Sequence, residues 1–317
     1  MVEIVRRSRK SPVLTPSKIP CLHSLPTINI TQGCLLGCVY CYIQGYPNYP
    51  GRNRIVLFEN TPRLLKQELR RRRLQPKRVY FSPSSDAFQG RPEVDEVSLE
   101  TMRILLEAGV EVAFLTKGFV TDSFLQLFRK YSNLVFAQVG LTTLEVRLCR
   151  QLEPNADSPN NRLATIQNLI DLGITTTARL DPLVPDLTDT TAKLHPLLLA
   201  LHDAGIRRAA ASFLFVRPQF AHFTTPVLRN VLPLGSSDST DWTHQRFLGG
   251  KGGGRMIDDE QRRRRFALVQ GLGAKIGIAI SSCLCKNPGL GTQRCAIAGP
   301  SCSPVTTLEP RQLTFPT

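Results

Sequence analysis

The sequence predicts an α/β fold in which a parallel sheet curves into a partial or complete barrel. Short β-rich runs alternate with amphipathic helical stretches along most of the 317 residues. Strands that alternate with helices of about 10–15 residues are typical of βαβ units. The expected strands are 27–30, 78–82, 111–116, 134–139, 175–180, 209–216 and 275–280. Six or seven such units favour a barrel whose active-site loops follow the carboxyl ends of the strands.

The helices between these strands have recognisable start and stop residues. Thr61 is a suitable N-cap, and Pro62 follows it at the first helical position. Gly109 and Gly173 stand where a helix commonly ends with a glycine. The helices delimited in this way are predicted over 62–73, 97–108 and 162–172.

Composition divides the chain into three parts. Residues 1–20 are basic, contain prolines and show no periodicity, so we expect a loosely packed N-terminal arm. Residues 21–282 hold the barrel domain, in which the Gly/Ser-rich stretch 235–254 is expected to be a surface loop or a lid. Residues 283–317 form a cysteine-rich C-terminal tail.

The longest apolar runs are far too short to span a membrane, and residues 1–10 lack the apolar segment of a signal peptide. We therefore expect a cytoplasmic protein without a membrane partner. In a reducing cytoplasm the nine cysteines favour metal ligation or catalysis over disulfide bonds.

The formal net charge of +15 is high for this length, and two arginine runs contribute to it at 70–73 and 262–265. Such runs are often solvated helix faces. They also suit a surface that binds a polyanion such as nucleic acid. Charge alone leaves both interpretations open.

Three cysteines follow the first predicted strand in the segment TINITQGCLLGCVYCY. The spacing Cys34-x3-Cys38-x2-Cys41 places three thiolates on one short loop, where they can ligate three irons of a [4Fe–4S] cluster. The fourth iron is then open to another ligand. Zinc is the less favoured alternative, because it requires a fourth protein ligand, for which Cys21 or His23 is nearest.

Several segments, read in order from about residue 11 to about residue 189, resemble the spore photoproduct lyase-like group of radical S-adenosylmethionine (SAM) proteins, also called DNA repair photolyase-like. Besides the cysteine loop they include SPSSDAFQGRPE, VAFLTKG, LEPNADSPNNRLATIQNLIDLGI and RLDPLVPDLTD. The resemblance implies a partial (β/α)6-type TIM barrel of the radical SAM kind. It implies an enzyme that reductively cleaves SAM at the [4Fe–4S] cluster and abstracts hydrogen from a substrate. A reductant such as flavodoxin or ferredoxin would supply the electron.

The resemblance also implies which residues hold SAM. Tyr40 is the aromatic residue expected beside the adenine, and polar groups at successive strand ends are expected to bind the rest. Arg179 on the fifth strand suits the SAM carboxylate, because a guanidinium is well shaped for it. The other expected SAM residues are Ser84, Ser85 and Asp86 after the second strand, and Gln138 and Thr142 around the fourth. Each of these is otherwise an ordinary strand-end group.

Two departures from the group's pattern bear on the reaction. Phe88 stands where tyrosine is usual. The lyase itself uses a cysteine near the end of the fourth strand, and residues 138–142 contain none. Cys149 comes later and is expected to be a buried structural thiol. Repair of spore photoproduct itself is therefore not expected.

The tail presents four more cysteines, Cys283, Cys285, Cys295 and Cys302, which suffice for a second iron–sulfur cluster. A zinc site, a hydrogen donor and unligated thiols remain open for them. Two functional hypotheses follow: repair or modification of nucleic acid, and radical maturation of a peptide or small molecule with the auxiliary cluster. A third, an iron–sulfur protein that never cleaves SAM, is least favoured because a structural cluster needs no open iron.

Overall fold

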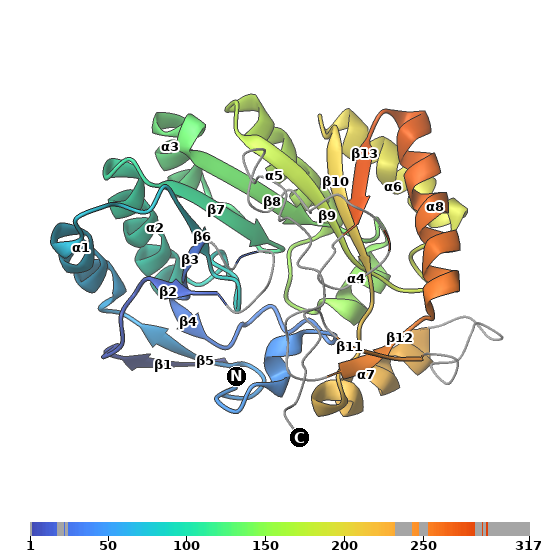
Figure 1. Ribbon diagram of the computed structural model, residues 1–317, viewed down its shortest axis with the longest axis horizontal. Helices are drawn as coiled ribbons and strands as arrows, with labels where there is room; N and C mark the ends of the chain where they lie inside the picture. Colours follow the sequence, from blue (N-terminus) through green and yellow to red (C-terminus); the bar gives the residue numbers. More distant parts are fainter. Residues whose placement is uncertain are drawn as a thin grey trace, which may run out of the picture.

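A curved eight-stranded sheet forms the centre of the protein in a computed structural model that describes residues 2–17, 22, 25–231, 243–246, 253–282, 287 and 290 (Figure 1). The strand order is β13-β10-β9-β8-β7-β6-β3-β2. Neighbouring strands from β3 to β13 pair in parallel, whereas β2 pairs antiparallel with β3. The bounds are β2 Thr15–Pro16, β3 Pro26–Ile28, β6 Arg78–Phe81, β7 Glu111–Thr116, β8 Val135–Gly140, β9 Thr175–Leu183, β10 Arg208–Phe213 and β13 Ala279–Ser282.

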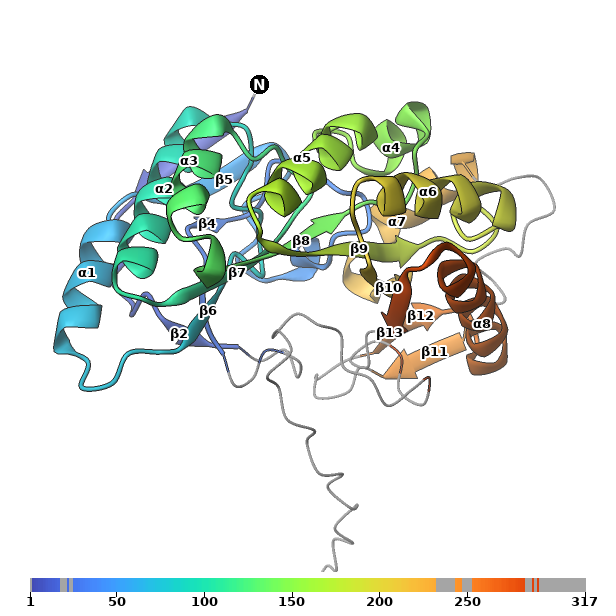
Figure 2. The ribbon, with the colours of Figure 1, turned by 90° about the horizontal axis from the view of Figure 1, so that it is seen from above.

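The sheet is an open barrel, since its two ends, β2 and β13, do not pair with each other within the described residues. Helices that connect the strands lie along one face of the sheet (Figure 2). The helices are α1 Thr61–Arg71, α2 Pro92–Glu107, α3 Asp122–Lys130, α4 Val146–Leu152, α5 Pro159–Asp171, α6 Thr191–Asp203, α7 Pro218–Val231 and α8 Asp259–Ile276, with short 3-10 turns η2 Tyr42–Gly45 and η3 Ser132–Leu134. This arrangement confirms the predicted partial barrel. Across the described part of the chain, no helix is long and apolar enough to cross a membrane.

A second sheet of three strands was not predicted. It has the order β1-β5-β4, with β1 Glu3–Arg7, β5 Arg54–Phe58 and β4 Thr31–Gln32. The N-terminal segment is therefore not loosely packed as expected: β1 pairs along its whole length with β5, and Val13 and Leu14 are buried. Outside both sheets, β11 Thr243–Arg246, in the Gly/Ser-rich stretch, forms an antiparallel pair with β12 Gly253–Met256, which begins at the end of that stretch.

The glycine stop signals are confirmed, and one predicted strand is displaced. Gly109 and Gly173 have φ angles of 72° and 75°, the left-handed conformation that a helix-ending glycine adopts readily. Helix α8 continues to Ile276 and ends at Gly277, whose φ is 90°. The strand expected at 275–280 therefore begins only at Ala279.

The core explains why Phe88 replaces the usual tyrosine. Its ring is fully buried, with its centroid 4.9 Å from that of Phe114 and 4.7 Å from that of Phe124. A buried tyrosine hydroxyl normally needs a hydrogen-bond partner. This aromatic cluster therefore favours phenylalanine.

Two arginines of the run on α8 are engaged inside the protein and do not contribute to the polyanion surface considered from the sequence. Arg262 is fully buried, forms an ion pair with Asp259, and lies 2.9 Å from the Met256 sulfur. Arg265 pairs with Asp186 at 2.7 Å and with Asp189 at 2.8 Å, which ties α8 to the loop after β9. These two residues serve packing, so that interpretation is wrong for them.

The run at 70–73 is exposed but lies at the other end of the barrel from the expected site. It ends α1 and precedes β6, so it lies near the amino end of that strand. Arg72 also pairs with Glu68 at 2.9 Å. These arginines are therefore not placed to line a site at the carboxyl ends of the strands.

The burial of Arg262 gives a stability prediction. We expect Arg262→Ala to lower the free energy of unfolding by about 3 kcal/mol, because a large buried group and its ion pair are lost. Its exposed neighbour provides the control, since Arg263→Ala should change the free energy of unfolding by less than about 0.5 kcal/mol. Urea denaturation followed by circular dichroism measures both, and equal effects would contradict the assignment.

Candidate active site

The loop 33–41, which we call the cysteine loop, connects β4 to η2 and carries Cys34, Cys38 and Cys41, all half-buried. Gly33 starts it with a φ of 85°, a conformation that other residues rarely adopt. A Cβ atom at Gly33 would also lie 2.7 Å from Cγ of Pro50 and 2.9 Å from the Arg54 carbonyl oxygen. The turn into Cys34 thus requires glycine at this position.

Side chains from distant segments hold the backbone of the cysteine loop. The side-chain oxygen Oε1 of Gln89 accepts a hydrogen bond from the backbone amide of Leu35 at 2.7 Å. The Asn155 amide donates to the Leu35 carbonyl at 2.8 Å, and the Thr224 hydroxyl donates to the Val39 carbonyl at 2.8 Å. The loop is therefore shaped by the segment after β6, the α4–α5 connection and helix α7.

The three thiols are arranged so that they need positive charge in order to ionise together. Burial raises the pKa of Cys34 well above its usual value, and the negative charges of Asp86, Cys38 and Cys41 add to this effect. Burial also raises the pKa of Cys38, as does Glu153, while the Lys117 ammonium opposes this. A metal bound to such thiols deprotonates them and supplies the missing charge.

The donor set fits a multi-iron cluster. Within the ranges that the structure describes, no group of three or more His, Cys, Asp or Glu side chains surrounds a position for one metal ion. A cubane makes a different demand, because each cysteine ligates a separate iron. Three mutually repelling thiols on one anchored loop meet that demand, and three cysteines leave the fourth iron open.

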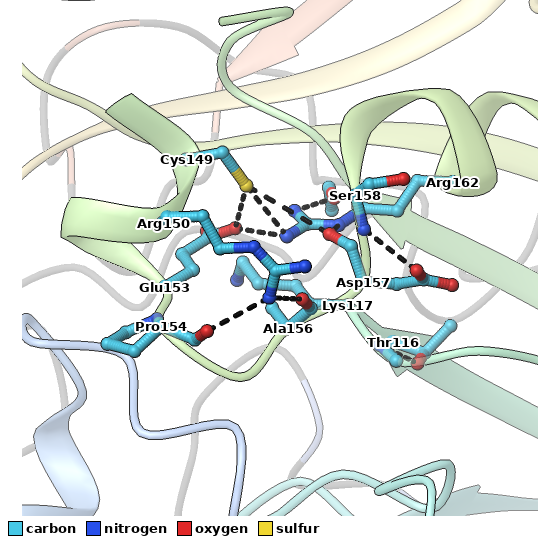
Figure 3. Close-up of polar contacts among 12 residues, drawn as sticks. Thr116, Lys117, Cys149, Arg150, Glu153, Pro154, Ala156, Asp157, Ser158 and Arg162 are labelled. Carbon is cyan, nitrogen blue, oxygen red and sulfur yellow. Dashed lines mark hydrogen bonds and ion pairs between the residues drawn. The ribbon is translucent and has the colours of Figure 1, made fainter. Parts of the chain in front are cut away.

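A buried network of ionic and polar contacts centres on Glu153 and Arg162 (Figure 3). Glu153 is 2% exposed and forms an ion pair with Arg162, which is 1% exposed. Glu153 also accepts a hydrogen bond from the Tyr40 hydroxyl. Arg162 donates to the carbonyl oxygens of Gly140 and Asp157, both at 2.9 Å. The network thereby links the cysteine loop to α4, α5 and the end of β8.

Cys149 belongs to the same network, and its sulfur lies 3.3 Å from a nitrogen of Arg162. It is buried, as the sequence predicted. Burial raises the pKa of its thiol, while the charge of Arg162 opposes this. Its contacts are those of a structural thiol.

Lys117 brings a positive charge toward the cysteine loop from the end of β7. Its ammonium nitrogen lies 5.6 Å from the centre of the Tyr40 ring. Its side chain passes over Gly140, where a Cβ atom would lie 2.9 Å from Cγ of Lys117. Burial lowers the pKa of Lys117, but Glu153 and Cys38 outweigh this, and the pKa is raised overall. Lys117 is therefore charged, between a carboxylate and a cysteine of the loop.

Asp86 lies at the expected strand end, and both oxygens of its carboxylate accept hydrogen bonds from other groups of the protein. One oxygen accepts hydrogen bonds from the Phe88 amide and the Thr116 hydroxyl, both at 2.9 Å. The other accepts from the Lys117 amide at 2.9 Å. Asp86 thus joins the ends of β6 and β7 and positions Lys117, and its direct contact with SAM stays a prediction.

The remaining expected SAM residues differ in their hydrogen bonding. Ser85 Oγ and both polar atoms of the Gln138 side chain are buried and have no partner among the described residues. Such groups are costly unless a ligand or water satisfies them. Arg179 is 4% exposed, and its Nη2 donates to Asp181 at 3.0 Å. The backbone amide of Ser84 is bound by Asn29 at 2.9 Å, and Thr142 is buried at the end of β8.

Residue-by-residue reasoning missed the network behind the loop. Glu153, Asn155 and Arg162 lie in the stretch LEPNADSPNNRL. This stretch belongs to the family resemblance, which was the signal available for them. The four tail cysteines, Cys283, Cys285, Cys295 and Cys302, lie outside the described residues.

Residues 28–195 match the Radical SAM superfamily. The chain belongs to this superfamily. It is therefore an enzyme of the radical SAM kind, and membership implies a [4Fe–4S] cluster and SAM. The sequence resemblance to this superfamily is confirmed.

Three relatives illustrate the similarity. An uncharacterised protein of Methanocaldococcus jannaschii is 31% identical over 196 residues, which cover 59% of this chain and 70% of that protein. One of Mycobacterium tuberculosis is 27% identical over 201 residues, 60% of this chain and 59% of that protein. A radical SAM Nα-GlyT isomerase of Pseudomonas phage M6 is 27% identical over 155 residues, 49% of this chain and 32% of that protein. The chain thus spans about three fifths of the mycobacterial relative.

Solved structures of spore photoproduct lyase share the fold. One variant has a TM-score of 0.68 at 15% identity, with 87% of this chain and 81% of that chain covered. A second variant, with bound AdoMet and dinucleoside spore photoproduct, gives the same values. At this identity the similarity establishes the architecture.

The Glu153–Arg162 pair gives a prediction for both stability and cluster retention. We expect Glu153→Ala to lower the free energy of unfolding by about 3–5 kcal/mol, because it leaves Arg162 buried without its partner. Iron should also be lost faster to a chelator, because the cysteine loop loses a support.

The matched control is Glu145→Ala, which removes an exposed pair with Lys193. Exposed pairs contribute at most about 1 kcal/mol. Urea unfolding and the rate of iron release to ferrozine measure both variants. Equal behaviour of the two would refute a supporting role for Glu153.

Proposed function

We propose that this enzyme holds a [4Fe–4S] cluster at Cys34, Cys38 and Cys41, cleaves SAM reductively there and acts on nucleic acid. The observation that carries the cluster assignment is the anchored loop with three half-buried, mutually repelling thiols. When bound, the cluster supplies the electron and an open iron for SAM.

The surrounding residues suit the binding of SAM. The charged Lys117 is placed to pair with the SAM carboxylate, and Tyr40 offers a ring beside the cysteine loop for the adenine. Gln138 and Ser85 carry buried polar atoms that a ligand would satisfy. Arg179 is a further candidate for the carboxylate, although Asp181 already accepts one of its hydrogen bonds.

Nucleic acid is the substrate class that the observations favour. The fold matches spore photoproduct lyase, one structure of which contains a dinucleoside spore photoproduct. The formal charge of +15 favours a polyanionic partner. Residues 138–142 contain no cysteine, so we propose repair or modification of nucleic acid other than spore photoproduct repair.

Other sequence predictions remain predictions. A second cluster at the tail cysteines, a flavodoxin or ferredoxin as reductant and a cytoplasmic location are all consistent with this proposal. The division into an N-terminal segment 1–20, a barrel domain 21–282 and a tail 283–317 has the same standing.

The cluster assignment is tested by removing single cysteines. After anaerobic reconstitution with iron and sulfide, alanine at position 34, 38 or 41 should abolish dithionite-driven release of 5′-deoxyadenosine from SAM, because one iron loses its ligand. Cys149→Ala serves as the control for loss of a thiol and should keep the iron–sulfur absorption and the electron paramagnetic resonance signal. Retained SAM cleavage in Cys38→Ala would refute the assignment.

The substrate class is tested by binding to a labelled single-stranded oligonucleotide, followed by fluorescence anisotropy. Affinity should fall steeply between about 50 and 200 mM salt if several phosphates are contacted. Charge reversal at Arg70, Arg71 and Arg73, which lie at the other end of the barrel from the cysteine loop, is the control and should leave SAM cleavage intact. If the wild type binds neither DNA nor RNA at about 50 mM salt, a peptide or small-molecule substrate replaces nucleic acid.

A further inference from the structure

A cavity of about 200 Å³ lies beside the cysteine loop, on the side of the three-stranded sheet. The N-terminal segment contributes Arg9, and the segment after the cysteine loop contributes Tyr46 and Tyr49. Ser84, which follows β6, also lines it and connects it to the strand ends of the barrel. None of the cysteine ligands or the network residues lines this cavity.

Arg9 is held in place as the cationic wall of the cavity. Its backbone amide donates to Asn60 at 2.8 Å, and its carbonyl accepts from the same side chain at 3.1 Å. Its guanidinium lies 4.5 Å from the centre of the Phe58 ring and donates to the Asn29 carbonyl. The Nε atom is buried and has no hydrogen-bond partner. An arginine fixed on an aromatic ring with a donor left over is suited to bind an anion.

The rest of the cavity offers aromatic faces and amides. Tyr46 is 37% exposed and Tyr49 is half-buried. Gly33, the first residue of the cysteine loop, lines the same cavity as Tyr49. Gln32 and Asn48 add amide groups at the wall. Aromatic faces bind bases by stacking, and amides bind base edges.

We propose that this cavity is a nucleotide subsite: it holds one base and phosphate of the substrate strand next to the residue that undergoes the reaction. The inference rests on the proposed action on nucleic acid and deepens it. Sites for drug-sized ligands measure about 300–1,000 Å³, so a cavity of about 200 Å³ suits a single ring with its phosphate. An electron-carrier protein binds instead across a broad surface, of up to about 1,200 Å² in total for such encounters.

The test compares two arginines on the same segment with the full-length, reconstituted protein. Arg9→Gln removes the guanidinium from the cavity, and Arg7→Gln removes an exposed one from strand β1. The probe is a fluorescein-labelled single-stranded DNA dodecamer, measured by anisotropy over a range of salt concentrations. Arg9→Gln should weaken binding about tenfold, as loss of a charge-assisted hydrogen bond implies. It should also reduce the slope of log affinity against log salt by about 0.7, the value for one phosphate of a single strand.

Arg7→Gln should change affinity by less than about twofold, because an exposed arginine makes no fixed contact. Tyr49→Leu is a second variant that leaves the Arg9 contacts in place and should weaken binding by about 5- to 150-fold, the loss expected for one stacked base. If the melting temperature or iron content shows that Arg9→Gln does not fold, binding by Tyr49→Leu decides whether the cavity is a nucleotide subsite.

Three outcomes overturn the subsite. The first is that Arg9→Gln and Arg7→Gln bind DNA with equal affinity. The second is that Tyr49→Leu binds DNA as tightly as the wild type. Alternatively, Arg9→Gln binds DNA normally but slows flavodoxin-driven SAM cleavage and not dithionite-driven cleavage, which identifies an electron-carrier site. If the wild type itself does not bind nucleic acid, the proposed function is wrong. If the wild type and the variants all bind equally well, only the subsite is wrong.

Discussion

The buried ion pair between Glu153 and Arg162 is the interaction on which the site's geometry depends. Two charges with almost no exposure to water are costly, and only saturated hydrogen bonding offsets that cost. Here Arg162 fills its donors with backbone carbonyls of β8 and the α4–α5 connection, and Glu153 accepts from Tyr40. Replacing such a pair by apolar residues is often neutral for stability. Its value here is the fixed placement of Tyr40, and with it of the cysteine loop.

Around this pair, opposite charges alternate toward the expected cluster. The Glu153 carboxylate raises the pKa of both Arg162 and Lys117, and Cys38 also raises the pKa of Lys117. A cluster with three thiolates adds negative charge in a buried place, which nearby cations stabilise. Lys117 thus provides a positive charge beside the cysteine loop before any iron binds. The Glu153 carboxylate keeps Lys117 protonated.

Much of this architecture could be predicted from the sequence, because it is encoded locally. The parallel strands appeared as short β-rich runs, and Gly109 and Gly173 ended their helices as expected. The cysteine spacing pointed to the loop 33–41, whose role as the cluster site stays a prediction. The three-stranded sheet was missed because β1 is short and charged, and its partner β5 lies 47 residues or more away in sequence. The roles of Arg262 and Arg265 were missed for a related reason, since an arginine run looks the same whether its members face water or acidic partners.

The close approach of Lys117 to Gly140 has an evolutionary consequence. The ends of the neighbouring strands β7 and β8 lie so close that the Lys117 side chain occupies the space that a side chain at position 140 would need. A methyl group added to β8 would displace the ammonium without altering a single charge in the sequence. A chain that keeps both the cysteines and the lysine is therefore not guaranteed the same electrostatics. Among homologues, the residue at this position reports on the lysine's location better than the presence of the lysine itself.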